Sequence, residues 1–184
     1  MKKAKVPVRK AAKAKPVAKK AKAPVVKKSK LTAKKPAAVR YPTAVNPARV
    51  GRYPAKAGAG GGYVWDEVLE YRVWCHPVFG AEPKAGQDDY FHAFSTHAKA
   101  MAFFHRTEGA DEPIALIRQK QFIHEAEPGK FSHVKKARIT EWPVEFLSRP
   151  KRNARTIPDF LSPNAPANRL EILRGTAKPV AKLR

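Results

Sequence analysis

The sequence predicts an α+β domain with a small, mainly antiparallel sheet, one main helix and basic segments on either side. Three observations predict this class: two short stretches alternate apolar and polar residues, a capped helical stretch follows them, and two further strand-like stretches are joined by a Pro-Gly turn. The expected order is β-β-α-β-β within residues 63–147. Residues 1–62 are expected to form a disordered basic tail, and residues 148–184 an irregular basic extension with short helical turns.

The first two strands are predicted from alternation. The stretch DEVLEYRVWCHP has a period of two, which places Leu69, Tyr71 and Val73 on one face. Pro77 ends this strand, because proline lacks the N–H that a strand ladder requires. After a loop with two glycines, YFHAFS predicts a second short strand.

The stretch HAKAMAFFHRT has the signals of a helix. Thr96 is the predicted N-cap and Gly109 the predicted C-terminal stop. Ala100, Phe103 and Phe104 share one side of this helix. That apolar side is therefore expected to cover one face of the sheet.

Two further strands and a hairpin turn complete the predicted sheet. PIALIRQKQFIH predicts the third strand and FSHVKKARITEW the fourth. Between them, Pro128 and Gly129 occupy the central positions of a type II turn, so the pair is expected to form a hairpin. Short helical turns are expected at 144–147 and 158–161, and a brief helix in NRLEILRG.

The positive charge is concentrated outside the predicted domain. The chain has 184 residues and a net charge of +23. Residues 1–62 contain 19 Lys and Arg and no acidic residue, whereas residues 63–147 contain 10 basic and 13 acidic residues and so carry −3. Residues 148–184 contain 9 basic and 2 acidic residues and carry +7. A run of like charge is typical of a solvated arm that binds a polyanion.

The tail is rich in Lys, Ala and Pro, and its prolines interrupt any helix that the Lys/Ala stretches begin. Lysines on a flexible chain neutralise phosphates and release counterions, so we expect binding to nucleic acid without sequence specificity, with DNA favoured over RNA. The predicted contacts in the tail are Lys2, Lys3, Lys5, Arg9, Lys10, Lys13, Lys15, Lys19, Lys20, Lys22, Lys27, Lys28, Lys30, Lys34, Lys35 and Arg40.

A second basic zone lies near the end of the predicted domain, with Trp142 and Phe146 interleaved among its cations. Aromatic and basic side chains together are typical of surfaces that bind nucleic acid. The alternative is a solvated hairpin face, and the sequence does not separate the two. The basic residues of this zone are Lys135, Lys136, Arg138, Arg149, Lys151, Arg152 and Arg155.

The glycine run, residues 58–62, is interpreted as a hinge between tail and domain. A phosphate-binding loop requires glycines between a strand and the N-terminus of a helix. Here Pro54 precedes the run without an apolar strand, a strand-like stretch follows it, and no Gly-Lys-Ser/Thr ending is present. Both flanks therefore differ from those of a phosphate loop.

No catalytic or metal-binding residues are predicted. The six histidines lack a dense ligand spacing such as His-Glu-x-x-His, and zinc usually requires three or four ligands. Cys75, the single cysteine, alternates with apolar residues and is expected to be buried. One cysteine excludes an intrachain disulfide and favours a reducing compartment.

The expected location is the cytoplasm, in association with the nucleoid. No apolar run is long enough for a membrane span, so no membrane partner is expected. The start MKKAKVPVRK has the charge of a signal peptide but lacks the apolar stretch that would follow.

Two resemblances add to this interpretation. The first 40 residues resemble, by composition, the tails of linker histones and of bacterial histone-H1-like nucleoid proteins.

Residues 63–162, with YVWDEVLEYRVWCHP, DDYFHAFSTHAKAMAFF and the stretch from GADEPIALIRQ to ITEWPVEFL, resemble short bacterial proteins labelled GNAT-type N-acetyltransferases. That resemblance implies acetyl-CoA as the cofactor. The acetyl-CoA loop, Arg/Gln-x-x-Gly-x-Gly/Ala, has its nearest match in Ala55-x-x-Gly58-x-Gly60, which lacks the Arg/Gln, so no family residue is transferred.

The expected function is therefore that of a non-enzymatic, nucleic-acid-associated protein without a cofactor, whose domain has an unidentified ligand. The first alternative is a divergent GNAT-like acetyltransferase that uses acetyl-CoA. The second is a module that binds a protein partner through the domain while the tail serves solubility.

Overall fold

The computed structural model describes residues 40–86 and 88–178, which belong to one compact unit. The α+β class with a mainly antiparallel sheet is confirmed. The strands are β1 (Gly58–Ala59), β2 (Glu67–Cys75), β3 (Tyr90–Phe94), β4 (Ile114–Gln119), β5 (Phe122–Glu127), β6 (Lys130–Val134) and β7 (Arg138–Pro143). The helices are α1 (His97–Phe104), α2 (Thr156–Leu161) and α3 (Arg169–Leu173), with 3-10 turns η1 (Pro47–Arg49), η2 (Pro77–Phe79) and η3 (Val144–Ser148).

Five strands form the main sheet in the order β1-β7-β4-β2-β3, and all neighbours are antiparallel except β1 and β7. The predicted third and fourth strands each divide into two. Their outer halves, β4 and β7, pair within this sheet, whereas β5 and β6 pair as a separate hairpin. The predicted hairpin turn is confirmed, with Glu127 opposite Lys130 and Gly129 at φ +80°.

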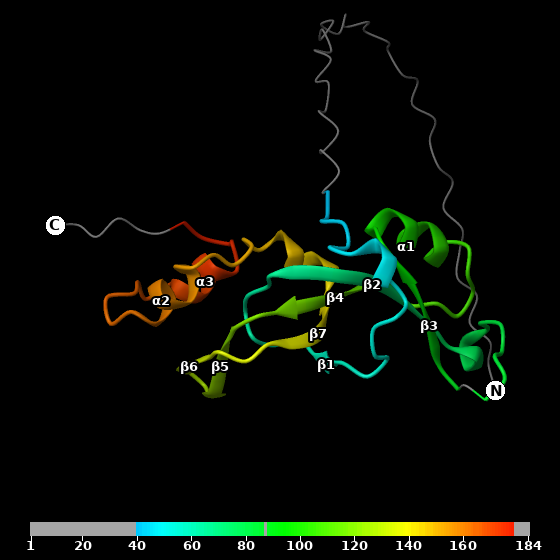
Figure 1. The fold of residues 1–184 in the computed structure, drawn as a ribbon, viewed down its shortest axis with the longest axis horizontal. Helices are drawn as coiled ribbons and strands as arrows, with labels where there is room; N and C mark the ends of the chain where they lie inside the picture. Colours follow the sequence, from blue (N-terminus) through cyan, green and yellow to red (C-terminus); the bar gives the residue numbers. More distant parts are fainter. Residues whose placement is uncertain (1–39, 87, 179–184) are drawn as a thin grey trace, which may run out of the picture. The chain divides into compact units, whose positions relative to one another are not determined.

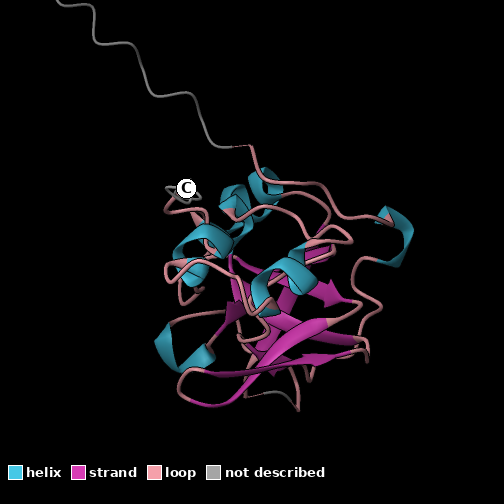
Figure 2. Ribbon diagram, turned by 90° about the vertical axis from the view of Figure 1, so that its left-hand side faces the viewer, coloured by secondary structure: helices cyan, strands magenta, loops and turns pink. Residues whose placement is uncertain are grey.

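Helix α1 covers the face of the sheet that carries Tyr71, Val73 and Trp142 (Figure 1). Ala100 of this helix is fully buried in the same cluster. The predicted N-cap is confirmed, because Thr96 Oγ1 accepts the Lys99 N–H at 3.3 Å. Figure 2 shows the strands as a curved layer with most helical segments on one side of it.

Gly109 does not end α1 as predicted, because the helix stops at Phe104. It lies instead where its carbonyl accepts the His76 N–H at 2.8 Å, beside the end of β2. Its φ is +64°, and a Cβ there would lie 2.8 Å from the His76 carbonyl oxygen and closer still to the Ala81 nitrogen. Glycine is therefore required both by the left-handed backbone and by the close packing.

The expected face assignment of β2 is wrong at its beginning. The pairing of β2 with β4 shifts between Val68 and Glu70, and Leu69 is the extra residue of this bulge. Val68 consequently packs with Tyr71 on the α1 side, whereas Leu69 packs with Leu116 in a separate cluster.

The expected disordered tail is too long at its C-terminal end. Residues 40–62 belong to the folded unit, and Ala44 and Tyr53 are buried there. Tyr53 joins the cluster of Leu69 and Leu116, on the side of the sheet away from α1. Residues 1–39 lie outside the described residues, so the expectation for them remains a prediction.

A buried ion pair holds this segment to the sheet. The side chains of Arg72 and Glu70 are both 0% exposed, and Arg72 Nε donates to Glu70 Oε1 at 2.8 Å. The guanidinium also donates to the carbonyls of Pro54 and Ala55 at 2.7 and 3.0 Å. Glu70 Oε2 accepts the Gly51 N–H at 2.7 Å. These two side chains thus tie backbone groups of residues 51–55 to the sheet, and those backbone groups complete the hydrogen bonding of the buried pair.

The glycine run is a packed corner and not a hinge. Gly58 and Ala59 pair with β7, and the Gly60 carbonyl accepts the Thr140 hydroxyl at 3.0 Å. A Cβ on Gly62 would lie 2.7 Å from Gln119 Oε1. The interpretation as a hinge failed because the partners of this corner are more than fifty residues away in the sequence.

A second hydrophobic core lies beneath the β5–β6 hairpin. Val64, Ile123, Ile157 and Phe160 are buried together there. The residues come from β5, α2 and the chain just before β2, and Figure 1 shows α2 and α3 beside the hairpin. The expected helical turns of the basic extension are confirmed, and through residue 178 the extension is part of the folded unit.

We predict that Gly109→Ala destabilises the protein by about 1–3 kcal/mol more than Gly129→Ala. Both glycines have positive φ, so each substitution carries the same left-handed strain of about 1–2 kcal/mol. Only Gly109 has neighbouring backbone in the way, since a Cβ on Gly129 meets nothing within 4 Å. Urea unfolding of the two variants measures the difference, and equal unfolding free energies would contradict the packing argument.

We predict that Arg72→Met lowers the free energy of unfolding by about 3–5 kcal/mol, because it leaves the Glu70 carboxylate buried without a cation. Adding Glu70→Gln should recover part of this loss. Arg155→Met, at an exposed pair with Asp159, is the control and should change stability by less than about 1 kcal/mol. A small effect of Arg72→Met in urea unfolding would show that the pair does not hold the segment.

Candidate nucleic-acid interface

The predicted contacts between Lys2 and Lys35 lie outside the described residues. Arg40 is exposed at the start of the described chain. In the second basic zone, Lys135, Lys136 and Lys151 are exposed. These three side chains are accessible to an anionic surface, as expected of solvated cations.

Arg138 holds the fold together and is not a free cation. Its Nε donates to Gln119 Oε1 at 2.5 Å, and its guanidinium lies 4.0 Å from the centre of the Phe122 ring. Burial lowers the pKa of this arginine below its usual range. Arg138 therefore has a structural role at the glycine corner, and its assignment as a nucleic-acid contact stays a prediction.

Arg152 is likewise engaged within the fold. Its Nε and a terminal nitrogen lie 2.8 and 2.7 Å from Asp66 Oδ1, and Asp66 is 5% exposed. The Arg152 N–H donates to the Trp65 carbonyl at 3.0 Å. Because both contacts are internal, Arg152 positions the chain around Lys151 rather than offering its own charge. Its assignment as a nucleic-acid contact also stays a prediction.

The structure brings part of the second basic zone together around a cavity of about 460 Å³, which we call the arginine–aromatic cavity. Arg149 lies 3.7 Å from the centre of the Phe146 ring and 5.3 Å from that of Trp142. The indole of Trp65 donates to the Arg149 carbonyl at 3.0 Å and so holds its backbone. The lining residues are Gly61, Tyr63, Trp142, Phe146, Arg149 and Arg174.

The two arginines of the cavity form no direct ion pair among the described residues, although the charge of Glu125 acts on Arg174 at longer range. None of the ion pairs between described residues includes Arg149 or Arg174. Burial, and then repulsion by Arg174, lower the pKa of Arg149. The negative charge of a bound anion offsets the repulsion between the two arginines and stabilises the charged form of Arg149, so the electrostatics favour an anionic ligand.

Tyr63 forms one wall of the cavity in an unusual backbone conformation. Its φ is +62°, and it is the one non-glycine residue of the described chain with positive φ. The hydroxyl donates to Glu125 Oε2, which raises the pKa of the phenol. Glu125 Oε1 accepts the Gly129 N–H at 2.7 Å. The carboxylate nearest to this wall is thus already occupied by two donors.

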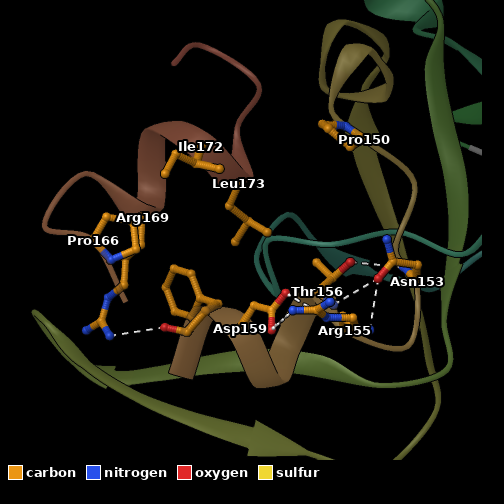
Figure 3. A pocket seen from close by; sticks show the side chains of 10 residues that line it. Pro150, Asn153, Arg155, Thr156, Asp159, Pro166, Arg169, Ile172 and Leu173 are labelled. Atoms are coloured by element: carbon orange, nitrogen blue, oxygen red, sulfur yellow. Dashed lines mark hydrogen bonds and ion pairs between the residues drawn. The ribbon is translucent and has the colours of Figure 1, made fainter. Parts of the chain in front are cut away.

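A second cavity of about 600 Å³ lies between α2 and α3 (Figure 3). Its charged groups are satisfied internally: Arg155 Nε lies 3.3 Å from Asp159, and Arg169 donates to the Phe160 carbonyl at 3.1 Å. The lining residues are Pro150, Asn153, Arg155, Thr156, Asp159, Phe160, Pro166, Arg169, Ile172 and Leu173. The two cavities therefore differ in whether their arginines have partners.

Of the six residues that line the arginine–aromatic cavity, sequence reasoning placed three in one zone, assigned Gly61 to a hinge and missed two. Trp142, Phe146 and Arg149 were predicted as one zone, and the structure brings them together. Tyr63 and Arg174 were missed, because one follows the glycine run and the other is a single arginine in the extension. Their only sequence signal was an aromatic beside a glycine turn and a cation at the end of a short helix.

The histidine and cysteine chemistry is modest. Among the described residues, no group of three or more His, Cys, Asp or Glu side chains is placed to hold a metal ion. Cys75 is buried as predicted, and burial raises the pKa of its thiol. His76 lies between two carboxylates, with Nδ1 2.8 Å from Asp89 and Nε2 2.9 Å from Asp111. Two such partners favour the imidazolium, in which both ring nitrogens donate.

Comparison of the chain with protein-family models, with curated proteins and with solved structures found no match in any of the three. Within residues 40–178, apart from residue 87, no helix has the length and apolar character needed to cross a bilayer.

We predict that His76 titrates above its ordinary pKa of about 6.5, because Asp111 and then Asp89 accept hydrogen bonds from it. The pKa of His92 should lie below that ordinary value, because burial and then Lys84 lower it. The folded pKa of His76 is raised, so its stabilising effect is complete below about pH 6.5 and is lost as the pH rises through the folded value. NMR titration of the ring protons measures both midpoints, and Asp111→Asn should lower only that of His76. A His76 midpoint at or below that of His92 would contradict the arrangement.

Proposed function

We propose that this protein binds nucleic acid without sequence specificity, with DNA favoured over RNA, through charge on its N-terminal segment and on the face of the folded unit that carries Lys151 and the arginine–aromatic cavity. The observation that carries this proposal is the segregation of charge. Residues 1–39 hold 15 basic residues and no acidic one, whereas residues 40–178 hold 21 basic and 15 acidic residues and so carry only +6. Association with the nucleoid is part of the same proposal.

The folded unit supports the proposal through the contrast between its paired and unpaired cations. Arg72, Arg118 and Arg152 form ion pairs with carboxylates inside the fold. Arg149 and Arg174 have no such partner among the described residues, although Arg149 is half-buried. Cations that the fold leaves without a counterion are available to phosphate.

We predict that the full chain binds duplex DNA with a steep salt dependence, and fluorescence anisotropy between about 0.05 and 0.2 M salt measures it. Each neutralised phosphate contributes about −0.9 to the slope of log K against log salt. Replacing tail lysines by glutamine should therefore make the slope shallower by up to about 0.9 per residue. The tail variant is K19Q/K20Q/K27Q/K28Q, and the charge-matched control is K56Q/K84Q/K99Q/K130Q, which changes exposed lysines of the folded unit.

Equal slopes for the tail variant and the control would show that net charge alone matters and that the tail has no special role. Absence of duplex binding at the lowest salt would overturn the proposal itself.

The acetyltransferase alternative stays a prediction. Its nearest loop match, Ala55 to Gly60, enters a strand that pairs with β7, and the corner after it is packed against Gln119 and Arg138. A shift of the unfolding temperature by acetyl-CoA would favour the alternative. A protein partner of the folded unit also stays a prediction.

A further inference from the structure

We propose that the arginine–aromatic cavity binds one unstacked nucleotide of single-stranded nucleic acid, with the phosphate held by Arg149 and Arg174 and the base held among the aromatic walls. This inference rests on the proposed function and names the form of nucleic acid that the folded unit selects.

The anionic part of the ligand follows from the two arginines. Both line the same cavity, repel one another, and have no carboxylate partner among the described residues. Arg149 is held in place from two sides, by its contact with the Phe146 ring and by the Trp65 indole bonded to its carbonyl. A guanidinium positioned in this way keeps N–H donors for an incoming phosphate, and its fork matches phosphate oxygens.

The planar part of the ligand follows from the walls. Tyr63, Trp142 and Phe146 surround the arginines, and the Trp142 and Phe146 rings meet edge to face with centres 5.8 Å apart. Trp142 is 1% exposed and its N–H is bonded to the Gly61 carbonyl at 3.2 Å, so the indole closes the floor of the cavity, and the half-buried rings of Tyr63 and Phe146 are the ones that a base can reach. Aromatic walls of this kind accept any base, because every base has a π face.

The volume of the arginine–aromatic cavity, and the contacts of the arginines in the second cavity, indicate further what kind of ligand binds. A volume of about 460 Å³ lies within the range of about 300–1,000 Å³ that small-ligand sites occupy. The larger cavity between α2 and α3 also contains arginines, but Arg155 is paired with Asp159 and Arg169 with the Phe160 carbonyl. Among the described residues, only the arginine–aromatic cavity combines two arginines whose guanidinium groups have neither a carboxylate nor a carbonyl partner.

Single strands are selected because the cavity requires an unstacked base. In a duplex the bases are stacked and paired, so a duplex presents only its phosphates to this surface. Duplex and single strand should therefore bind the tail alike, and only the single strand should also occupy the cavity.

The experiment compares full-length variants in binding a labelled oligothymidylate and a duplex of the same length, at the upper end of the salt series. R149Q/R174Q should weaken single-strand binding about tenfold, the effect of losing a stacked and charge-paired nucleotide, and duplex binding less than about threefold. R155Q is the control, because Arg155 is exposed on the same extension and already paired. It should leave both affinities within about twofold.

The single variant R174Q tests whether misfolding explains the loss of binding. Arg174 is exposed and lacks a partner within the described fold, so its substitution should leave the fold intact. It should reproduce part of the single-strand loss with an unchanged unfolding temperature. Equal losses for strand and duplex would overturn the inference, since they would reflect charge alone. Failure of wild type to bind the duplex at the lowest salt as well would instead overturn the proposed function.

A second readout separates the base from the phosphate. NMR titration of the full chain with thymidine monophosphate should shift the Trp142 indole and Tyr63 ring signals, whereas inorganic phosphate should shift mainly the Arg149 side chain. Ring shifts of the same size with phosphate alone would overturn the role of the aromatic walls.

Discussion

The fold depends on a charge pair that has no access to water. Arg72 and Glu70 lie two residues apart on β2, and a buried pair of this kind is costly unless its remaining donors and acceptors are also satisfied. Here they are satisfied by Glu141 and by the backbone of residues 51–55. Residues 51–55 thus both cover the pair and supply the two carbonyls and the N–H that replace water around its charges.

The position of the candidate site depends on the same segment that contacts this buried pair. With residues 51–55 held on the sheet, the chain enters β1 beside β7 and turns at the glycine corner. The carbonyls of Gly60 and Gly61 then meet Thr140 and the Trp142 indole, and the next residue but one, Tyr63, forms a wall of the cavity. The cavity is thus built on a segment that resembles the tail in composition but belongs to the folded unit.

The strands, the Thr96 cap and the Pro-Gly turn were predictable because their signals are local. The boundary of the folded unit was not, because alternation assigns Glu70 and Arg72 to a solvated face, and only tertiary structure shows that residues 51–55 cover them. The same limit applies to the candidate site. Sequence shows that Arg138, Arg149 and Arg152 are basic, but which arginine has a carboxylate or amide partner depends on residues as distant as Asp66 and Gln119.

That distinction bears directly on function, because the arginines of this fold differ in what an anion would gain from them. A guanidinium that already donates to Asp66 or Glu70 must break those bonds to bind phosphate, and the broken carboxylate would be left buried. Arg149 and Arg174 have no such cost, and an anion would relieve the repulsion between them. Tail lysines attract any polyanion at long range, whereas two fixed, unpaired arginines beside aromatic rings act only at contact. The first property favours association with nucleic acid in general, and the second favours a particular form of it.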